Sequence, residues 1–409
     1  VVDADSQATA GQFTTEITTG GIAENNNQVV IQIDASGQVT VGSVDATGAG
    51  TDVEVRTENN IVLNDVDATD TVYLEATDGG TSQTILDNNG AANNVTATKL
   101  DARADLFIGR VANQEVFLDP EDTGYTAGIG IGNTIETAVS NLTAITTDVD
   151  GEISIDNTIS ALLTVDDVIP SVGNTAHMYV RNDNAITVNT WTIDANDDVA
   201  LIAGFNTGVG DLALPAQAIN VGRGTGGPGP DGGTIRLEAA AAGQQVDMAG
   251  DSNLVDITAL KFILKSGESE TLTMMDVANA DIAITGTGNF IDFTQSTGFA
   301  SADDAHNVTF VDLDGNGDGT GAGTQHSIQT ASGDVSVTQM HSNSDIIYND
   351  LVNLDSNNGD GGDITSVVRF VSATPLANNP GNGIASDVSG TDDIGGNFIL
   401  DMANITLEN

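Results

Sequence analysis

The most informative absence in this chain is cysteine. None occurs among the 409 residues, so disulfides, thiol nucleophiles and cysteine-ligated zinc sites are all excluded. The four histidines, His177, His306, His326 and His341, are scattered and form no HExxH motif. No run of about 18 apolar residues is present, which excludes an ordinary transmembrane helix. Thiol chemistry, the common zinc motifs and membrane insertion by a helix are therefore not expected.

Positive charge is almost as scarce. The chain has 10 lysines and arginines against 59 acidic residues, a formal net charge of −49. So few cations cannot neutralise a phosphate backbone or an anionic lipid surface, and we expect neither nucleic acid nor membrane as a partner. Such self-repulsion is relieved when charges are spread along an elongated body, screened by salt or bridged by divalent cations. These solutions favour an extracellular or cell-surface location; a merely solubilising surface is the alternative.

Proline and aromatic residues are also few, at 7 prolines and 4% aromatics, too few prolines for a collagen-like chain or a polyproline linker. Apolar residues make up 39% of the chain, much of it valine, isoleucine, leucine and alanine, and β-branched residues favour strands. The 47 glycines, with many Asn, Asp and Thr residues, supply turns at short intervals. The composition predicts an all-β protein.

A glycine followed by a polar residue and an apolar–polar–apolar triplet recurs along the chain. The five copies are Gly37–Val41, Gly151–Ile155, Gly210–Leu214, Gly233–Leu237 and Gly333–Val337. Glycine accepts the positive φ of a tight corner, and the alternation places every second side chain on one face of a strand. Each copy predicts a turn followed by a short strand.

The apolar clusters recur about every 8 to 12 residues, which fits a β-sandwich, a barrel or a solenoid. Residues 134–147 also fit a helical period, although short strands explain them equally well. A sandwich of this length needs several linked modules, and no linker is present, whereas a parallel solenoid accepts any number of coils, at about 20 to 25 residues each. We predict one elongated parallel β-solenoid over residues 1–409, with tandem β-sandwich domains as the alternative.

Three glycine-rich or polar segments predict loops that leave the solenoid, near residues 222–233, 315–323 and 374–396. The chain opens on Val1 without a signal-peptide pattern, as in a processed protein or a fragment of a longer chain. Its last residues, 398–409, read as two strands without a polar cap. An uncapped edge favours pairing with another copy, so we expect self-association, end to end or lateral.

One local motif predicts a metal site. Oxygen-bearing side chains alternate with other residues in one short stretch, at Asp312, Asp314, Asn316, Asp318 and Thr320. This spacing, with glycines that allow a tight wrap, suits the six to eight oxygen ligands of Ca²⁺. The match to an EF-hand loop ends at Gly323, where a bidentate glutamate is required, so a plain acidic turn is the alternative. Asp360 and Asp363 form a weaker candidate.

Catalytic patterns are weak. Neighbouring carboxylates, the minimum for acid/base cleavage of a sugar linkage, occur at Asp166–Asp167, Asp197–Asp198 and Asp303–Asp304. In a chain this rich in aspartate such pairs arise by chance, and the Gly-His-Gly pattern of polygalacturonases is absent. We therefore predict that the chain is not an enzyme. Trp191, the only tryptophan, alternates with strand residues and is expected in the core rather than as a sugar platform.

The segments 139–157 and 331–340 resemble the degenerate repeats of secreted bacterial exoproteins of the filamentous-haemagglutinin and autotransporter-passenger type. The resemblance implies a right-handed parallel β-helix and a role in surface adhesion. We therefore expect an extracellular structural or adhesive component of a cell-surface layer, sheath or filament, stabilised by cations, with cell-surface polysaccharide as a candidate partner. The alternatives are a surface-layer or filament subunit of tandem β-sandwiches that exchange strands, and a carbohydrate-active β-helix enzyme.

Overall fold

The computed structural model describes residues 36–284, except 47, 78–81, 91, 111–133, 149–150, 171–175, 194–196, 218, 223–231, 242 and 249–252. Outside this range it describes only the strands 2–6, 13–18, 28–35, 291–295, 308–310, 328–330, 335–339, 346–348, 368–372 and 398–400. The described residues contain strands and turns but no helix, hence none that could cross a membrane. The chain is all-β, as the composition predicts.

The chain divides into two compact units, which are described separately: unit 1 within Val1–Phe117 and Tyr125–Thr207, and unit 2 within Gly208–Asn409. The strands of unit 1 are β1 (Val2–Ser6), β2 (Phe13–Thr18), β3 (Gln28–Ala35), β4 (Val39–Ala46), β5 (Thr51–Thr57), β6 (Ile61–Leu63), β7 (Val66–Ala68), β8 (Thr71–Ala76), β9 (Thr84–Asp87), β10 (Val95–Thr96), β11 (Lys99–Ala104), β12 (Phe107–Ile108), β13 (Ile135–Ala138), β14 (Asn141–Thr146), β15 (Glu152–Asn157), β16 (Leu163–Ile169), β17 (His177–Asn182), β18 (Ile186–Val188) and β19 (Asp198–Ala203).

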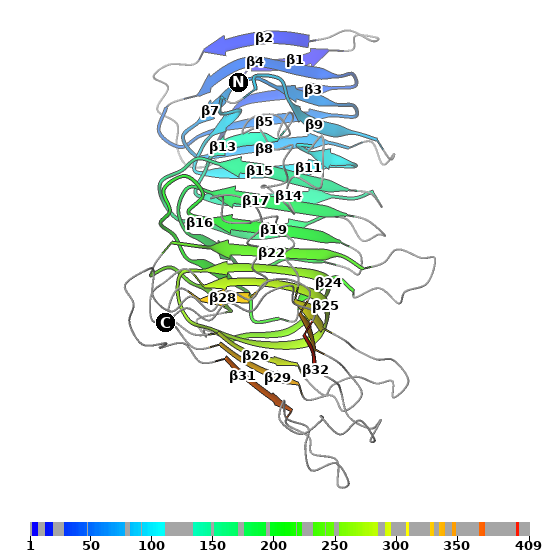
Figure 1. Cartoon of the computed structure of the whole chain (residues 1–409). Helices are drawn as coiled ribbons and strands as arrows, with labels where there is room; N and C mark the ends of the chain where they lie inside the picture. Colours follow the sequence, from blue (N-terminus) through cyan, green and yellow to red (C-terminus); the bar gives the residue numbers. More distant parts are fainter. Residues whose placement is uncertain are drawn as a thin grey trace, which may run out of the picture. The chain divides into compact units, whose positions relative to one another are not determined.

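Within unit 1 the chain passes repeatedly from one parallel ladder to another, as the stacked arrows of Figure 1 show. The first ladder runs β1-β3-β5-β8-β11-β14-β16-β18. The second ladder runs β2-β4-β6-β9-β12-β15-β17-β19. A third, short ladder runs β4-β7-β10-β13-β15. Every one of these pairings is parallel, which makes the unit a parallel β-solenoid.

The core of unit 1 is built from in-register stacks of aliphatic side chains. In the second ladder one stack consists of Val39, Ile61, Ile85, Ile108, Ile153, Met178 and Val199, and each residue is directly opposite the next. None of the seven is more than 2% exposed. The first ladder contributes a facing stack of Val53, Val72, Leu100, Leu142, Val165 and Val188. Full burial of each such side chain stabilises the fold by roughly 1.5–3 kcal/mol.

Unit 2 repeats this architecture. Its strands are β20 (Leu212–Leu214), β21 (Ile219–Asn220), β22 (Thr234–Ala239), β23 (Val246–Met248), β24 (Asn253–Ser266), β25 (Glu270–Ile284), β26 (Ile291–Gln295), β27 (Val308–Phe310), β28 (Ile328–Thr330), β29 (Val335–Gln339), β30 (Ile346–Tyr348), β31 (Val368–Ser372) and β32 (Phe398–Leu400). Parallel pairings run β22-β24-β25-β26-β29-β31 and β25-β27-β30-β32.

Several sequence predictions can now be compared with this fold. All five glycine motifs are confirmed as strand starts, in β4, β15, β20, β22 and β29. The helical interpretation of residues 134–147 is wrong: this stretch forms β13 and β14, because Ile135, Leu142 and Ala144 each complete an interior stack. The tandem β-sandwich alternative is wrong as well, since sandwiches are antiparallel and these ladders are parallel. Of the predicted loop segments, residues 223–231, 315–323 and 374–396 lie outside the described residues.

The glycine of the motif serves more than one purpose. Gly210 has a positive φ of 153°, and in the fourth copy it is the preceding residue, Gly232, whose φ is positive, at 87°. Gly151 has no positive φ; a Cβ placed on it would lie 2.2 Å from Thr146 Oγ1. The turn into β15 therefore requires glycine for close packing rather than for backbone conformation.

Candidate functional site

The burial of the outer face of the second ladder increases along unit 1. In most solenoid strands only the inward side chains are buried, and β4, β6 and β8 follow this alternation. In β15 every residue is buried, and in β17 and β19 every residue but the first. We call the outward, buried side chains of β13, β15, β17 and β19 the covered face. It consists of Glu136, Glu152, Ser154, Asp156, Tyr179, Arg181, Ala200 and Ile202.

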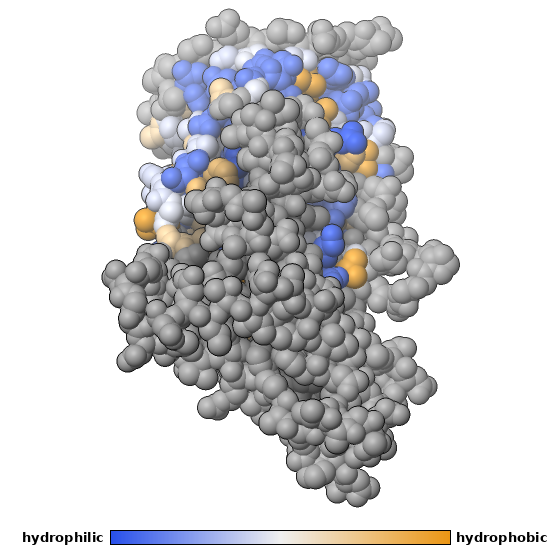
Figure 2. All heavy atoms as spheres, in the orientation of Figure 1, coloured by the Kyte–Doolittle hydropathy of each residue, from blue (hydrophilic) through white to orange (hydrophobic). Residues whose placement is uncertain are grey.

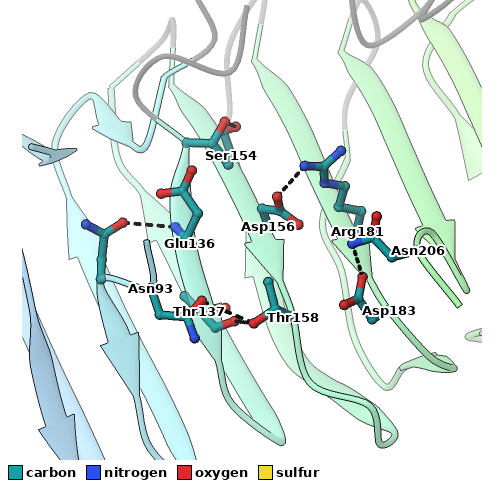
Figure 3. A network of polar contacts seen from close by, with 11 residues as sticks. Asn93, Glu136, Thr137, Ser154, Asp156, Thr158, Arg181, Asp183 and Asn206 are labelled. Atoms are coloured by element: carbon teal, nitrogen blue, oxygen red, sulfur yellow. Dashed lines mark hydrogen bonds and ion pairs between the residues drawn. The ribbon is translucent and has the colours of Figure 1, made fainter. Parts of the chain in front are cut away.

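A row of charged residues crosses the covered face. Glu136 of β13 is in register with Asp156 of β15, and Asp156 with Arg181 of β17. The Arg181 guanidinium donates a hydrogen bond to Asp156 Oδ2, as Figure 3 shows. Arg181 also contacts the ring of Phe205, whose centroid lies 3.8 Å from Arg181 Cζ, a cation–π contact. Arg181 is only 6% exposed and therefore acts as the buried counter-charge of this row.

Glu136 lacks such a counter-charge. It is 7% exposed, and no hydrogen bond reaches its Oε2. Burial is the main cause that raises its pKa, and the charges of Asp87 and Asp156 add to the effect. A backbone hydrogen bond and Arg181 oppose the rise, and the resulting pKa is about 8. At neutral pH most Glu136 side chains therefore hold a proton, and the row Glu136–Asp156–Arg181 carries almost no net charge.

A second charged row lies at the start of these strands, where Glu152, His177 and Asp198 are in register. His177 Nδ1 lies 3.1 Å from Asp198 Oδ2. Burial alone would lower the pKa of His177, but the hydrogen bond with Asp198 and the charges of Asp198, Glu152 and Asp197 raise it above the ordinary value. The contact at the edge of the covered face is an ion pair when His177 is protonated.

Polar groups also occur inside the coil. Asn157 and Asn182, the last residues of β15 and β17, point inward with no exposed surface, and we call them the asparagine ladder. Asn157 Nδ2 donates to Asn182 Oδ1 at 2.9 Å and to Val139 O at 3.0 Å. Its Oδ1 accepts from Thr137 Oγ1 at 2.8 Å and from Val139 N at 2.9 Å. The ladder satisfies the backbone where the chain turns from the second ladder towards the first.

The outer face of the first ladder carries an accessible cluster. Tyr73 lies between two arginines, with Arg56 Cζ 4.8 Å and Arg103 Cζ 5.8 Å from its ring centroid. Its hydroxyl contacts Glu75 Oε2 at 2.8 Å. Burial, followed by the hydrogen bond and charge of Glu75, raises the pKa of Tyr73 to about 12. Arg56 also pairs with Glu75 at 3.3 Å, so the cluster is internally compensated and leaves no free cation for an anionic ligand.

Most of the residues predicted as sites from the sequence lie in parts of the chain that the structure does not describe, so these predictions stay predictions. Asp312, Asp314, Asn316, Asp318 and Thr320 lie outside the described residues, as do Asp360, Asp363 and Asp303–Asp304. Asp197 and Asp198, which flank the start of β19, have separate partners. Asp197 accepts a hydrogen bond from Ala176 N, and Asp198 lies against His177. Across the described part of the chain, no three His, Asp or Glu side chains converge as metal ligands. Trp191 is 2% exposed, which confirms it as a core residue.

Sequence reasoning missed Glu136, Asp156 and Arg181. The signal that could have found them is the coil length, because the three residues are separated by 20 and 25 positions, close to one coil each. Comparison with known proteins adds no further assignment: no protein-family model, no curated protein and no solved structure matches the chain.

Proposed function

We propose that this chain is an extracellular structural or adhesive protein, a component of a cell-surface layer, sheath or filament. The observation that carries the proposal is the continuous stack of seven buried apolar residues in the second, parallel ladder of unit 1. Such a body gains stability coil by coil and presents a long side-chain surface, which suits a scaffold. The repeat texture shared with secreted adhesive exoproteins also supports this role.

We propose further that cations moderate the acidic exterior. Much of the visible described surface is hydrophilic (Figure 2). In unit 1, Asp45 and Asp67 occupy opposed positions in neighbouring coils, and both act electrostatically on Asp65. Burial, together with the charges of Asp67 and Asp45, raises the pKa of Asp65. Like charges at strand spacing repel, and bound or condensed cations would relieve that repulsion. Calcium at Asp312–Thr320 remains part of this proposal.

We propose no catalytic role. The carboxyl groups of Glu136 and Asp156 lie opposite each other on neighbouring strands, an arrangement that acid/base chemistry could use. They are 7% and 8% exposed, which leaves a polysaccharide no access to them. This burial supports a scaffold over a carbohydrate-active enzyme.

The proposal is tested by following assembly and adhesion of the purified protein. We expect self-association, measured by sedimentation and electron microscopy, to increase when Ca²⁺ is added. We also expect the protein to bind members of a panel of cell-surface polysaccharides without cleaving them. A protein that stays monomeric at every cation concentration and binds none of the panel would contradict the proposed role. Release of shortened sugar chains, lost on Glu136→Gln, would support the enzyme instead.

A further inference from the structure

The outer face of β5, β8 and β11 in unit 1 is accessible and carries far more positive charge than the chain average. Along these three strands of the first ladder, buried residues alternate with accessible ones. The accessible side chains include two rows in register across the coils, the acidic row Glu54–Tyr73–Asp101 and the arginine row Arg56–Glu75–Arg103. We call these six residues the mixed-charge patch. It holds three acidic residues and two arginines, whereas the whole chain has 59 acidic residues and 10 basic ones.

The patch is exposed and held by its own contacts. The side chains of Arg56 and Arg103 are 46% and 44% exposed, and both guanidinium groups lie over the Tyr73 ring. Tyrosine and arginine are among the residues that contribute most to protein–protein contacts, and a ring already held by two guanidinium groups loses little freedom on binding. Each arginine is paired with a carboxylate, so the patch lacks the surplus positive charge that an anionic ligand requires.

The charges of the patch are complementary to those of a second copy of the same patch. Two sheet faces can meet about a two-fold axis that lies between them and runs along the stack of coils. This axis places the acidic row of one copy opposite the arginine row of the other, so that Glu54 faces Arg56, Asp101 faces Arg103 and each contact occurs twice. The coil spacing of about 4.8 Å is the same in both copies, so these contacts form together. A two-fold axis along the strands would instead oppose acid to acid and arginine to arginine.

We propose that the mixed-charge patch is a lateral contact between two copies of this chain, related by a two-fold axis along their coils. The inference rests on the proposed role in a layer, sheath or filament, which requires copies to associate, and it names the surface that they use. Chains with a net charge of −49 repel one another, and a surface of interleaved acids and arginines lets two copies approach with the least repulsion.

The strength of the contact follows from its size. The patch spans two strand spacings, about 10 Å, which is less than a stable interface between two molecules covers. The contact is therefore weak in an isolated pair and becomes effective where many copies are arrayed, because each further contact is made between molecules already held close together.

Opposite charge reversals test the contact. Arg103→Glu leaves acid facing acid across the two-fold axis, and Asp101→Arg leaves arginine facing arginine. Each variant alone should self-associate about tenfold more weakly than the parent protein in sedimentation at low salt, because each reversal makes two contacts per dimer repulsive. An equimolar mixture of the two variants should recover association, since both contacts between unlike copies then join opposite charges.

The total charge of the chain predicts a different result. Asp101→Arg makes the chain less negative, so repulsion between whole molecules predicts stronger association for this variant, not weaker. The matched control is Glu58→Arg, which changes the net charge equally at an exposed position outside the patch and should not weaken association. Fluorescence of the buried Trp191 checks that each variant is folded. If a reversal does not fold, Arg103→Gln, which removes one partner of both contacts, must still weaken association.

The outcomes separate this contact from the proposed function. If the parent associates but neither reversal weakens it, if only Arg103→Glu does, or if the mixture does not recover, the contact is overturned and the proposed function stands. A parent protein that never associates overturns both. Unchanged self-association together with lost polysaccharide binding in both variants would make the patch a glycan site and overturn the contact between copies.

Discussion

Replacing Asn157 by alanine is the most informative perturbation of the fold. The side chain is fully buried and makes four hydrogen bonds, to Thr137, Asn182 and both backbone groups of Val139. A hydrogen bond contributes about 1 kcal/mol net, and buried groups left without a partner cost more. The alanine variant leaves Val139 N, Val139 O and Asn182 Oδ1 without this partner. We expect a loss of about 3–5 kcal/mol in the free energy of unfolding.

Urea unfolding followed by Trp191 fluorescence measures this loss, because Trp191 is buried in the same unit. The matched control is Asn189→Ala, since Asn189 is exposed and makes one side-chain hydrogen bond, 3.2 Å to Asp166 Oδ1. Its expected effect is within about 0.5 kcal/mol. Equal effects of the two substitutions would refute the idea that the asparagine ladder holds the coils together at this corner.

Three more outcomes are expected. Burial raises the pKa of the fully buried Glu270 to about 8, although hydrogen bonds from Ser266 and Val246 N act to lower it. The protonated side chain therefore contributes its full stabilisation below pH 4.5, and this stabilisation is lost as the pH rises through 8. Glu270→Gln should remove this pH dependence from the urea stability of unit 2, and an unchanged pH dependence would contradict the prediction. Gly267→Ala places a Cβ 1.7 Å from Ala241 O, so it should lower the free energy of unfolding by about 1–3 kcal/mol in a thermal unfolding experiment. A change near zero, as expected at an open turn, would contradict this prediction. Ile85→Ala should cost about 2–5 kcal/mol in urea unfolding, and a loss below about 1 kcal/mol would show that the stack is not tightly packed.

Strand positions were predictable because they depend on local pattern. The motif Gly151–Ile155 predicts a turn and a strand wherever it occurs, and β15 follows it. Register was less predictable, because the separation of paired core residues ranges from 18 positions between Phe262 and Ala280 to 45 between Ile108 and Ile153. Insertions at the turns change this spacing without changing the strands themselves.

The covered face could not be predicted from the sequence. Glu152, Ser154 and Asp156 alternate with isoleucines, a pattern typical of a strand whose polar side faces water. All three are buried, because burial of an outer face depends on contacts distant in sequence. The inward position of Asn157 could not be predicted for a similar reason. An asparagine beside a turn is typical of a turn residue, and the hydrogen bond with Asn182 comes from a neighbouring coil.

Stacking of parallel coils in register is the central claim, and disulfide trapping tests it directly. Thr164 of β16 is opposite Thr187 of β18, and both side chains point outward. Their Cα atoms are at strand spacing, about 4.8 Å, within the range a disulfide needs, whereas Asn189 lies two residues further along. Thr164→Cys with Thr187→Cys should cross-link rapidly under mild oxidation, and Thr164→Cys with Asn189→Cys should not. Equal or reversed yields would contradict the parallel register.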